Sequence, residues 1–346
     1  MGVFSVGGIG IDPGSMNLTV CLENEGVVLR EPSLVLSMRN DVEDVLAVGR
    51  DARQMLGRTP HDVVLLSPVM DGAVADTKLA TIMIQSLSEK ALGKKRPLEK
   101  NKLAVSVSQG VTRVARAAIE TAVLNAGARR AYLVRSTAAA TLGSGLDFDQ
   151  PKGAMIVVIG GACTEIGVLS MNSIAASRSV RTGGLAFDEA IIRFLRREKG
   201  IIIGQRTAED LKQDIGSAVA IDKKKDEEVL LRGRDAASGK PAQVTVKASD
   251  IQKALERPVE DLIETIREAF ENTPGELASD IVERGITLSG GGALLTGLSD
   301  RLSKLLGVPV RVGDNPQDDV ATGLCMTVTD DRLLRRLIQS GCIFEV

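Results

Sequence analysis

The sequence is poor in aromatic residues and nearly devoid of histidine. Of its 346 residues only 2% are aromatic, with no Trp and a single Tyr, and the one histidine is His61. Proteins that bind single-stranded nucleic acid stack bases on aromatic rings, so this class is disfavoured. A zinc site built on imidazoles and a Ser-His-Asp triad are also disfavoured, because the lone histidine lies in a polar stretch.

Cysteine is scarce and scattered. Cys21, Cys163, Cys325 and Cys342 lie far apart, form no CxxC pair and sit in or beside apolar stretches. This spacing predicts buried free thiols in a reducing compartment and argues against disulfides or metal ligation.

Neither strong charge nor a long apolar run is present. The formal net charge is -2, which gives no electrostatic reason to expect a nucleic-acid partner. No apolar run approaches the length of a membrane span, and the start of the chain is too short for a signal peptide. We therefore expect a cytoplasmic protein.

What the chain does contain is a repeated α/β pattern. Its length exceeds what one hydrophobic core organises, which predicts two lobes. An apolar run at Val6 to Ile11 leads into a glycine turn and a second run at Asn17 to Cys21. After Pro151 the same order returns, with Ala154 to Ile159, a glycine turn and Glu165 to Leu169. Strands alternate with helical patterns such as 76–92 and 112–125, so a duplicated α/β domain is predicted.

Three glycine-rich segments follow β-like runs, at Gly10 to Ser15, Gly160 to Thr164 and Ser289 to Ala293. Glycine allows backbone amides to approach phosphate oxygens closely, so the segments together predict a nucleotide site between two halves. Each also has a plainer interpretation. Asp12 could cap its turn, and Gly160-Gly161 could form a tight strand-to-strand turn.

With these segments the chain resembles the actin superfamily, and within it most closely the bacterial MreB/Mbl family. The resemblance runs over about residues 8 to 325. Beyond the glycine loops it is carried by 28–33, 47–49, 52–60 (Ala-Arg-Gln-Met-Leu-Gly-Arg-Thr-Pro), 71–76, 187–191, 215–218, 276–280 and 287–295. Segment 52–60 sets it apart from the chaperones and kinases, which share only the glycine loops.

The resemblance implies an actin-like, ribonuclease H-like fold of two lobes, with duplicated mixed sheets flanked by helices and two small subdomains. The core of lobe I would comprise 1–32, 68–143 and 320–346, with 33–67 as its small subdomain. The core of lobe II would comprise 144–181 and 249–319, with 182–248 as its small subdomain.

It also implies an ATP or ADP site with magnesium, in which Asp12 holds a metal-bound water. The residues implied at the nucleotide are Asp12, Gly14, Ser15, Met16, Asn17, Gly160, Gly161, Thr164, Gly183, Gly184, Glu209, Lys212, Gly290, Gly291, Gly292 and Ala293. Glu209 and Lys212 would lie on the ribose and adenine side. Alternatively, they form only a solvated pair on one helix face.

The chain departs from the family pattern at the positions that carry hydrolysis. Ser136 stands where the family has the glutamate that orients the attacking water, and Val158 replaces the aspartate of the second phosphate loop. Ala162 replaces a glycine of that loop, and Leu185 replaces an acidic residue. A hydroxyl does not act as a base near neutral pH without an activating neighbour, so weak or absent ATP hydrolysis is expected.

The implied function is that of a cytoskeletal protein that binds adenine nucleotide and polymerises into filaments involved in cell shape or membrane-associated organisation. Its partners would be further copies of itself, an MreB paralogue and membrane-bound cell-wall synthesis proteins. Two alternatives are an active ATPase or phosphotransferase of the superfamily, and a nucleotide-dead adaptor that assembles with an intact paralogue.

Peripheral membrane contact is the remaining question. Family members touch membrane through an amphipathic N-terminus or an apolar loop. Here Val3 and Phe4 offer little apolar surface, and the basic segment 94–102 is expected to expose only Leu98. The basic, amphipathic tail 333–344 could contact membrane, but a terminal helix docked on its own domain is favoured.

Overall fold

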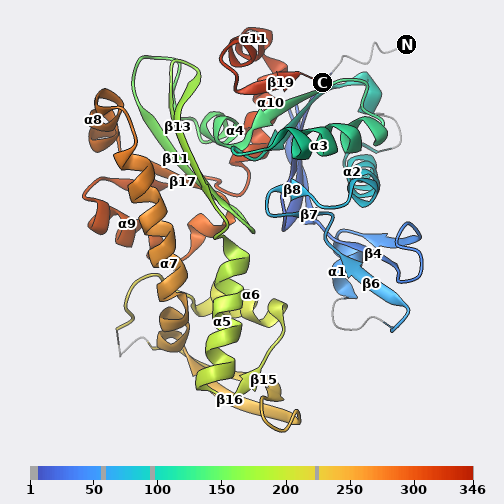
Figure 1. The fold of residues 1–346 in the computed structure, drawn as a ribbon, viewed down its shortest axis with the longest axis vertical. Coiled ribbons are helices and arrows are strands. Elements are labelled where there is room, and N and C mark those ends of the chain that lie inside the picture. The colour runs from blue at the N-terminus through green and yellow to red at the C-terminus, as the bar shows by residue number, and fades with distance from the viewer. Residues whose placement is uncertain (1–6, 56–59, 94–97, 223–225, 346) are drawn as a thin grey trace.

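The computed structural model describes residues 7–55, 60–93, 98–222 and 226–345. Figure 1 shows two α/β halves side by side, each built on a twisted sheet. Segment 56–59 of the family stretch and the N-terminal Val3 and Phe4 lie outside the described residues.

The first half contains a six-stranded sheet in the order β19-β10-β9-β1-β2-β3. Strands β1, β9 and β10 run parallel to one another, whereas β2, β3 and β19 are each antiparallel to the strands beside them. The bounds are β1 (Gly8–Pro13), β2 (Asn17–Leu22), β3 (Gly26–Pro32), β9 (Lys102–Val107), β10 (Ala131–Arg135) and β19 (Ile343–Glu345).

The second half repeats this topology in a five-stranded sheet, in the order β13-β12-β11-β17-β18. Again three parallel strands, β11, β17 and β18, continue into two antiparallel ones. The bounds are β11 (Ala154–Ile159), β12 (Thr164–Ser170), β13 (Ser173–Val180), β17 (Ile286–Ser289) and β18 (Val310–Val312). The predicted duplication is therefore present, and the turns β1–β2 and β11–β12 occupy equivalent places.

Helices cover both sheets, and the two helices predicted at 76–92 and 112–125 are present. Asp76 accepts a hydrogen bond from the Leu79 amide at 3.0 Å and caps α2 (Thr77–Leu92), which ends at Gly93 with φ of 69°. Thr112 caps α3 (Arg113–Asn125) in the same way. The second half carries α5 (Gly184–Glu198), α6 (Gln205–Ile215), α7 (Ala248–Glu271), α8 (Gly275–Arg284) and α9 (Leu298–Leu306).

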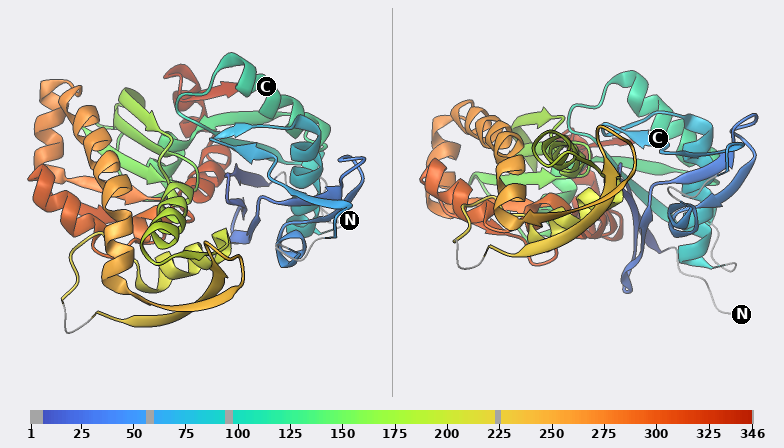
Figure 2. Two further views of the ribbon diagram at one scale, coloured as in Figure 1. Left: turned by 60° about the horizontal axis from the view of Figure 1, so that its bottom comes forward. Right: turned by 90° about the horizontal axis from the view of Figure 1, so that it is seen from below.

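Three small sheets complete the fold. One, in the order β5-β4-β6, lies beside α1 (Arg50–Gln54), and another, β14-β15-β16, packs against α5 and α7 at the far end of the second half (Figure 2). The third pairs β7 with β8. Their bounds are β4 (Val35–Met38), β5 (Val45–Val48), β6 (Val63–Leu66), β7 (Val69–Met70), β8 (Ala73–Val74), β14 (Ile201–Ile202), β15 (Glu228–Asp235) and β16 (Pro241–Lys247).

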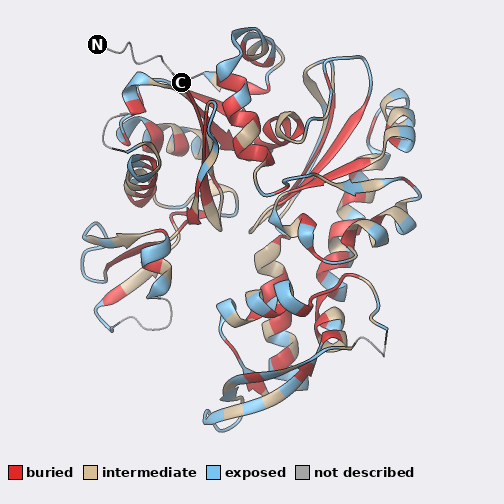
Figure 3. Cartoon of the chain, turned by 180° about the vertical axis from the view of Figure 1, so that it is seen from behind, coloured by how far each residue is buried: buried red, intermediate tan, exposed pale blue. Residues whose placement is uncertain are grey.

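The two halves meet at a helix pair, α4 (Ser136–Gly143) and α10 (Asp319–Thr329). A Cβ at Gly143 would lie 1.8 Å from the Asp319 carbonyl oxygen, and one at Gly323 would lie 1.8 Å from that of Ala139. Small residues therefore bring these helices into backbone-to-backbone contact. In Figure 3 buried residues gather along the two sheets and through this helix pair.

The C-terminal helix α11 (Asp331–Gln339) is docked on the molecule, as favoured from the sequence. Leu334 and Leu337 are buried in the core cluster that contains residues of α4 and α10. The expectation that Leu98 is exposed is wrong, because Leu98, in the short 3-10 helix Leu98–Lys100, packs into the core of the first half. Among the described residues, no helix is long and apolar enough to cross a membrane.

All four cysteines are free thiols, as predicted. Cys21, Cys325 and Cys342 are buried, whereas Cys163, in the turn between β11 and β12, is only partly buried. Burial and the nearby carboxylates of Glu165, Asp71 and Asp12 raise the pKa of the Cys163 thiol to about 12, so it stays protonated at neutral pH.

Candidate functional site

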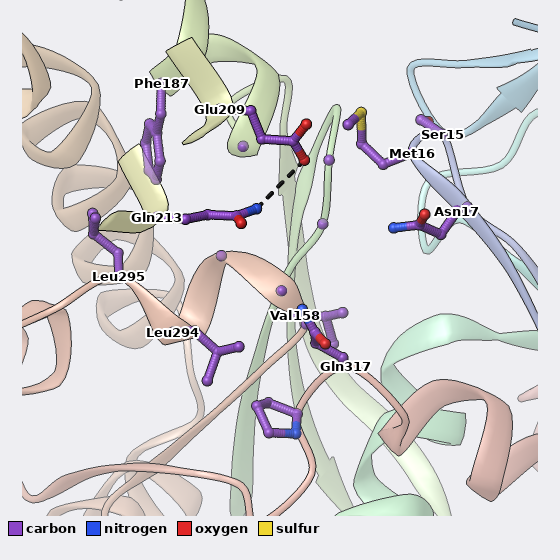
Figure 4. Close-up of a pocket in the computed structure, with 18 of the residues that line it drawn as sticks. Ser15, Met16, Asn17, Val158, Phe187, Glu209, Gln213, Leu294, Leu295 and Gln317 are labelled. Carbon is purple, nitrogen blue, oxygen red and sulfur yellow. Dashed lines mark hydrogen bonds between the residues drawn. The ribbon is translucent and has the colours of Figure 1, made fainter. Parts of the chain in front are cut away.

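A cavity of about 470 Å³ lies between the halves and is lined by both of them. In Figure 4, Ser15, Met16 and Asn17 of the first half face Glu209 and Gln213 of α6 across it. The predicted site residues that line the cavity are Asp12, Gly14, Ser15, Met16, Asn17, Gly160, Gly161, Gly184, Glu209, Lys212, Gly290, Gly291 and Gly292. Three predicted residues, Thr164, Gly183 and Ala293, are not part of this lining.

The first glycine turn places Asp12 at the end of β1, next to the cavity. Its carboxylate accepts a hydrogen bond from the hydroxyl of Ser106, which belongs to the neighbouring strand β9. Burial raises the pKa of Asp12 to about 6, the Ser106 bond opposes this shift, and the negative charge of Glu165 adds to it. A cation at this carboxylate would relieve the cost of its charge.

The second turn, between β11 and β12, is fixed from outside the cavity. The Gly184 amide donates to the Gly160 carbonyl at 3.0 Å, and a Cβ at Gly183 would lie 2.6 Å from the same oxygen. Thr164 is fully buried and donates its hydroxyl to the Thr182 carbonyl at 2.6 Å. Gly183 and Thr164 therefore hold the loop in shape, while Gly160 and Gly161 present their backbone to the cavity.

The third turn joins β17 to the 3-10 helix Gly291–Leu294. Gly290 has φ of 81°, and a Cβ there would lie 2.4 Å from the Ile159 carbonyl oxygen of β11. Gly290 also donates its amide to the Pro316 carbonyl at 2.6 Å. Glycine is required here to seat the turn against the second sheet. Ala293 is buried beneath the turn, with 2% of its surface exposed.

The two predicted residues of α6 are tied to other elements and are not a solvated pair. Glu209 forms an ion pair with Arg53 of α1 at 2.6 Å, which links the halves beside the cavity that Glu209 lines. Lys212 forms an ion pair with Asp188 at 2.7 Å and donates to the Gly184 carbonyl at 3.0 Å. Burial raises the pKa of Asp188 to about 6, and the Lys212 charge counteracts the shift.

Several lining residues were missed from the sequence because distant segments supply them. Arg30 of β3 donates to the Gln317 side chain at 2.7 Å and pairs with Asp318, so it forms a second link between the halves. Phe187, Gln213, Leu294 and Leu295 form a wall on the second half (Figure 4). The others are Thr19, Asp188, Thr296, Pro316 and Val320. Arg30 and Phe187 lie in segments that carry the family resemblance, which is the one signal that could have found them.

Comparison with known proteins decides the family. The family model described as MreB/Mbl protein matches residues 7–336. The chain belongs to the MreB/Mbl family. It is 41% identical to the cell shape-determining protein MreB of Escherichia coli K12, over 93% of either chain. It is 38% identical to the cell shape-determining protein Mbl of Bacillus subtilis 168, over 95% of this chain and 98% of that protein.

Solved structures confirm the actin-like fold. MreB5 of Spiroplasma citri bound to AMPPNP superposes with a TM-score of 0.87 at 29% identity, over 97% of this chain and 99% of that one. The same protein bound to ADP gives a TM-score of 0.88. A MamK double helical filament gives 0.76 at 18% identity, over 93% of this chain and 98% of that one, which supports the fold alone.

Ser136 and Val158, two positions at which the sequence is expected to depart from the family pattern, both lie beside Glu165. Val158 lines the cavity and pairs directly with Glu165 in the β11–β12 ladder. Ser136, the first residue of α4, donates its hydroxyl to Glu165 Oε2. Glu165 was not singled out from the sequence, and its place in an otherwise apolar strand was the available signal. The Ser136 hydroxyl is therefore paired with a buried carboxylate that the sequence did not reveal.

Proposed function

We propose that this chain binds ATP or ADP in the cavity between its halves and assembles into filaments of the MreB type. The observation that carries the proposal is that glycine turns from both duplicated sheets line one cavity. The cavity volume of about 470 Å³ lies in the range of small-molecule sites, roughly 300–1,000 Å³. The relative MreB5 bound to AMPPNP or ADP supports the choice of ligand.

The residues at the cavity fit an anionic nucleotide. Arg30 lines it, and its buried Nε has no hydrogen-bond partner among the described residues. We assign Gly14, Ser15 and Asn17 with Gly160 and Gly161 to the phosphates. Glu209, Lys212 and the Gly290 to Gly292 turn are assigned to the adenosine. Met16, which lies against Gly161, and Gly184 complete the lining, and Gly183, Thr164 and Ala293 support the turns.

Magnesium would bind together with the nucleotide, through its phosphates. The described residues contain no group of three His, Cys, Asp or Glu side chains that could hold a metal on their own. Asp12 is the carboxylate placed to hold a metal-bound water, which suits an ion that keeps several waters and is bound through few protein groups. The metal would supply charge neutralisation, and Asp12 would orient it.

Filament assembly follows from the family. The relatives are named cell shape-determining proteins, and we propose the same role here, in cytoplasmic filaments that can lie at the membrane. Head-to-tail contacts between lobes would be heterologous and so propagate without closing. The two lobes would be lobe I, with core 1–32, 68–143 and 320–346 and subdomain 33–67, and lobe II, with core 144–181 and 249–319 and subdomain 182–248. A paralogue and membrane-bound cell-wall synthesis proteins are the proposed partners.

We propose that hydrolysis is weak, because Ser136 and Val158 stand where carboxylates are expected. The alternatives are an active ATPase or phosphotransferase and a nucleotide-dead adaptor. Titration calorimetry with ATP and ADP in magnesium, pelleting with electron microscopy, and phosphate release would separate the three. Binding, filaments and slow release are expected. No heat and no thermal stabilisation at millimolar nucleotide would refute the binding site, and a monomer under every condition would refute assembly.

A further inference from the structure

Arg30 is a cavity residue of the first half whose side chain is bonded to the second half. It belongs to β3, and its guanidinium donates through Nη1 to Gln317 Oε1 at 2.7 Å and through Nη2 to the Asp318 carboxylate. Both partners lie in the segment that leads from β18 of the second sheet to α10. We call these two bonds the Arg30 link.

The register of the first sheet explains why Arg30 faces the cavity. Asp12 is directly opposed to Thr19 in the β1–β2 ladder, and Thr19 is directly opposed to Arg30 in the β2–β3 ladder. Directly opposed residues share one face of a sheet, so the three form a row that spans roughly 10 Å over three strands. All three line the cavity. Arg30 therefore extends from the wall that carries Asp12 to the opposite half.

The two partners of Arg30 differ in their relation to the cavity. Gln317 lines it next to the third glycine turn, since a Cβ at Gly291 would lie 3.5 Å from Gln317 Nε2. Asp318 is not among the described residues that line the cavity. The Arg30 link thus joins β3 to a residue beside the turn assigned to the adenosine, and half of the link can be removed without changing the cavity wall.

The Arg30 link is incompletely satisfied. Arginine has five N–H groups, and the buried Nε of Arg30 has no hydrogen-bond partner among the described residues. An unpaired buried donor costs free energy, which water repays when the donor is exposed. The side chains of Arg30 and Asp318 are also 32% and 29% exposed, and ion pairs that solvent reaches are weak. The link therefore favours joined halves but can break when the halves separate.

We propose that the Arg30 link holds the two halves together around a bound nucleoside diphosphate or triphosphate and thereby slows its release. The proposal rests on the proposed nucleotide site. A ligand that contacts both halves stabilises the arrangement in which they are joined, and any bond that favours this arrangement strengthens its binding. Because Asp318 already pairs with its charge, Arg30 acts on the nucleotide through the position of the halves. It is a positioning residue for this site.

The decisive measurement is the rate at which tritium-labelled ADP leaves the full chain in magnesium, chased with unlabelled ADP. Asp318→Ala removes the partner outside the cavity and leaves the charge of Arg30 in place. Within the described structure the Asp318 side chain makes no capping hydrogen bond to α10, so the helix keeps its start. Release should become about tenfold faster, since the loss of a link between halves affects mainly dissociation. If Arg30 were a phosphate ligand, freeing it would slow release. Slower or unchanged release overturns the proposal.

Matched variants identify the contact. Arg30→Met should speed release about as much as Asp318→Ala, and the double variant should be no faster than the faster single one, because all three lose the same link. Arg30→Lys can pair with Asp318 but lacks the fork that also reaches the neighbouring amide, so its rate should fall between. The control is Arg181→Ala, which removes an exposed ion pair between the halves, to Asp71 at 3.7 Å, and should change the rate less than about threefold. Independent, multiplying effects of Arg30→Met and Asp318→Ala would overturn the proposal.

A measurement without nucleotide tests the contact itself. Urea unfolding of the nucleotide-free wild type, Arg30→Met, Asp318→Ala and the double variant forms a double-mutant cycle. Because both side chains belong to one ion pair, the loss of stability in the double variant should be smaller than the sum of the single losses. Additive losses would overturn the proposal, since the pair would not exist in solution.

The outcomes separate this proposal from the proposed function. Wild-type chain that binds ADP, with Asp318→Ala releasing it no faster, overturns the role of the Arg30 link alone. Wild-type chain that binds no nucleotide overturns both. If Arg30→Met does not fold, the comparison of Asp318→Ala and Arg30→Lys with Arg181→Ala still decides.

Discussion

Replacing Asp12 by Asn should stabilise the nucleotide-free protein at neutral pH. Asp12 sits partly buried at the cavity, and burial raises the pKa of its carboxyl from 3.8 to about 6. The folded chain therefore holds a proton on Asp12 over a pH range in which the unfolded chain has lost it. Asn has the same shape, keeps an oxygen for the Ser106 hydroxyl and carries no charge to bury.

The sign and size follow from proton linkage. The contribution of Asp12 to stability is fully present below pH 3.8 and is lost as the pH rises through about 6. Well above pH 6 the protein has lost about 3 kcal/mol of unfolding free energy through Asp12, because each pKa unit between the folded and unfolded states corresponds to about 1.4 kcal/mol. Solvent that reaches the residue from the cavity lowers this figure, so it is an upper value. The Asp12→Asn chain should therefore be more stable at pH 7.5 by up to about 3 kcal/mol, with the advantage fading toward pH 4.

The assay is urea unfolding of both chains from pH 4.5 to pH 8, without nucleotide or magnesium. Asp188 and Asp319 also have pKa values raised to about 6 by burial, and their contributions cancel because both chains contain them. A stability difference that stays flat over this range would refute the reasoning. Adding magnesium and ADP should favour the wild type, because a cation beside Asp12 compensates its charge.

Four further substitutions have defined outcomes. Gly290→Ala should lower the unfolding free energy by about 1–3 kcal/mol in chemical denaturation and weaken ADP binding in calorimetry. The cause is that φ of 81° suits glycine and that the new methyl group meets Ile159. Unchanged ADP binding would show that this turn is not part of the site. Leu337→Ala should cost about 2–5 kcal/mol, since the side chain is fully buried, and no measurable loss would mean that α11 is not docked. Val158→Asp should lower the melting temperature in EDTA, because it places a carboxylate opposite Glu165, with recovery in magnesium. Combined with Ser136→Glu it should raise phosphate release above either single change, and a wild-type rate equal to that of an intact relative would refute the weak-hydrolysis proposal.

Local sequence signals predicted the frame of this protein well. Apolar runs followed by glycine turns gave β1 and β11 and the duplicated order of the two sheets. Asp76, Thr112 and Gly93 marked helix ends because caps act within one turn of the helix. Most of the predicted site residues line one cavity. They could be predicted because each turn directly follows a strand, so its glycines lie at the edge of the sheet.

Contacts between the two halves could not be predicted from local sequence signals. Arg30 meets Gln317 across 287 positions of sequence, and Arg53 meets Glu209 across 156. Glu165 looked like an ordinary polar residue in a strand, because its three donors come from segments that only the folded chain brings together. Leu98 was expected in solvent from its basic neighbours, yet it packs inward. The charges of neighbouring residues describe the segment itself, whereas the burial of a side chain depends on the parts of the fold against which the segment packs.

The backbone contact between α4 and α10 constrains how this chain can change. Any side chain at Gly143 or Gly323 would push the two helices apart, and with them the two sheets. Ser136 begins the same helix that Gly143 ends, yet a substitution there alters one hydrogen bond and leaves the helix spacing intact. The contact between α4 and α10 should therefore tolerate substitution far less than the polar contact at Ser136. The polar contacts at Ser136 can therefore change while the spacing of the two sheets is kept.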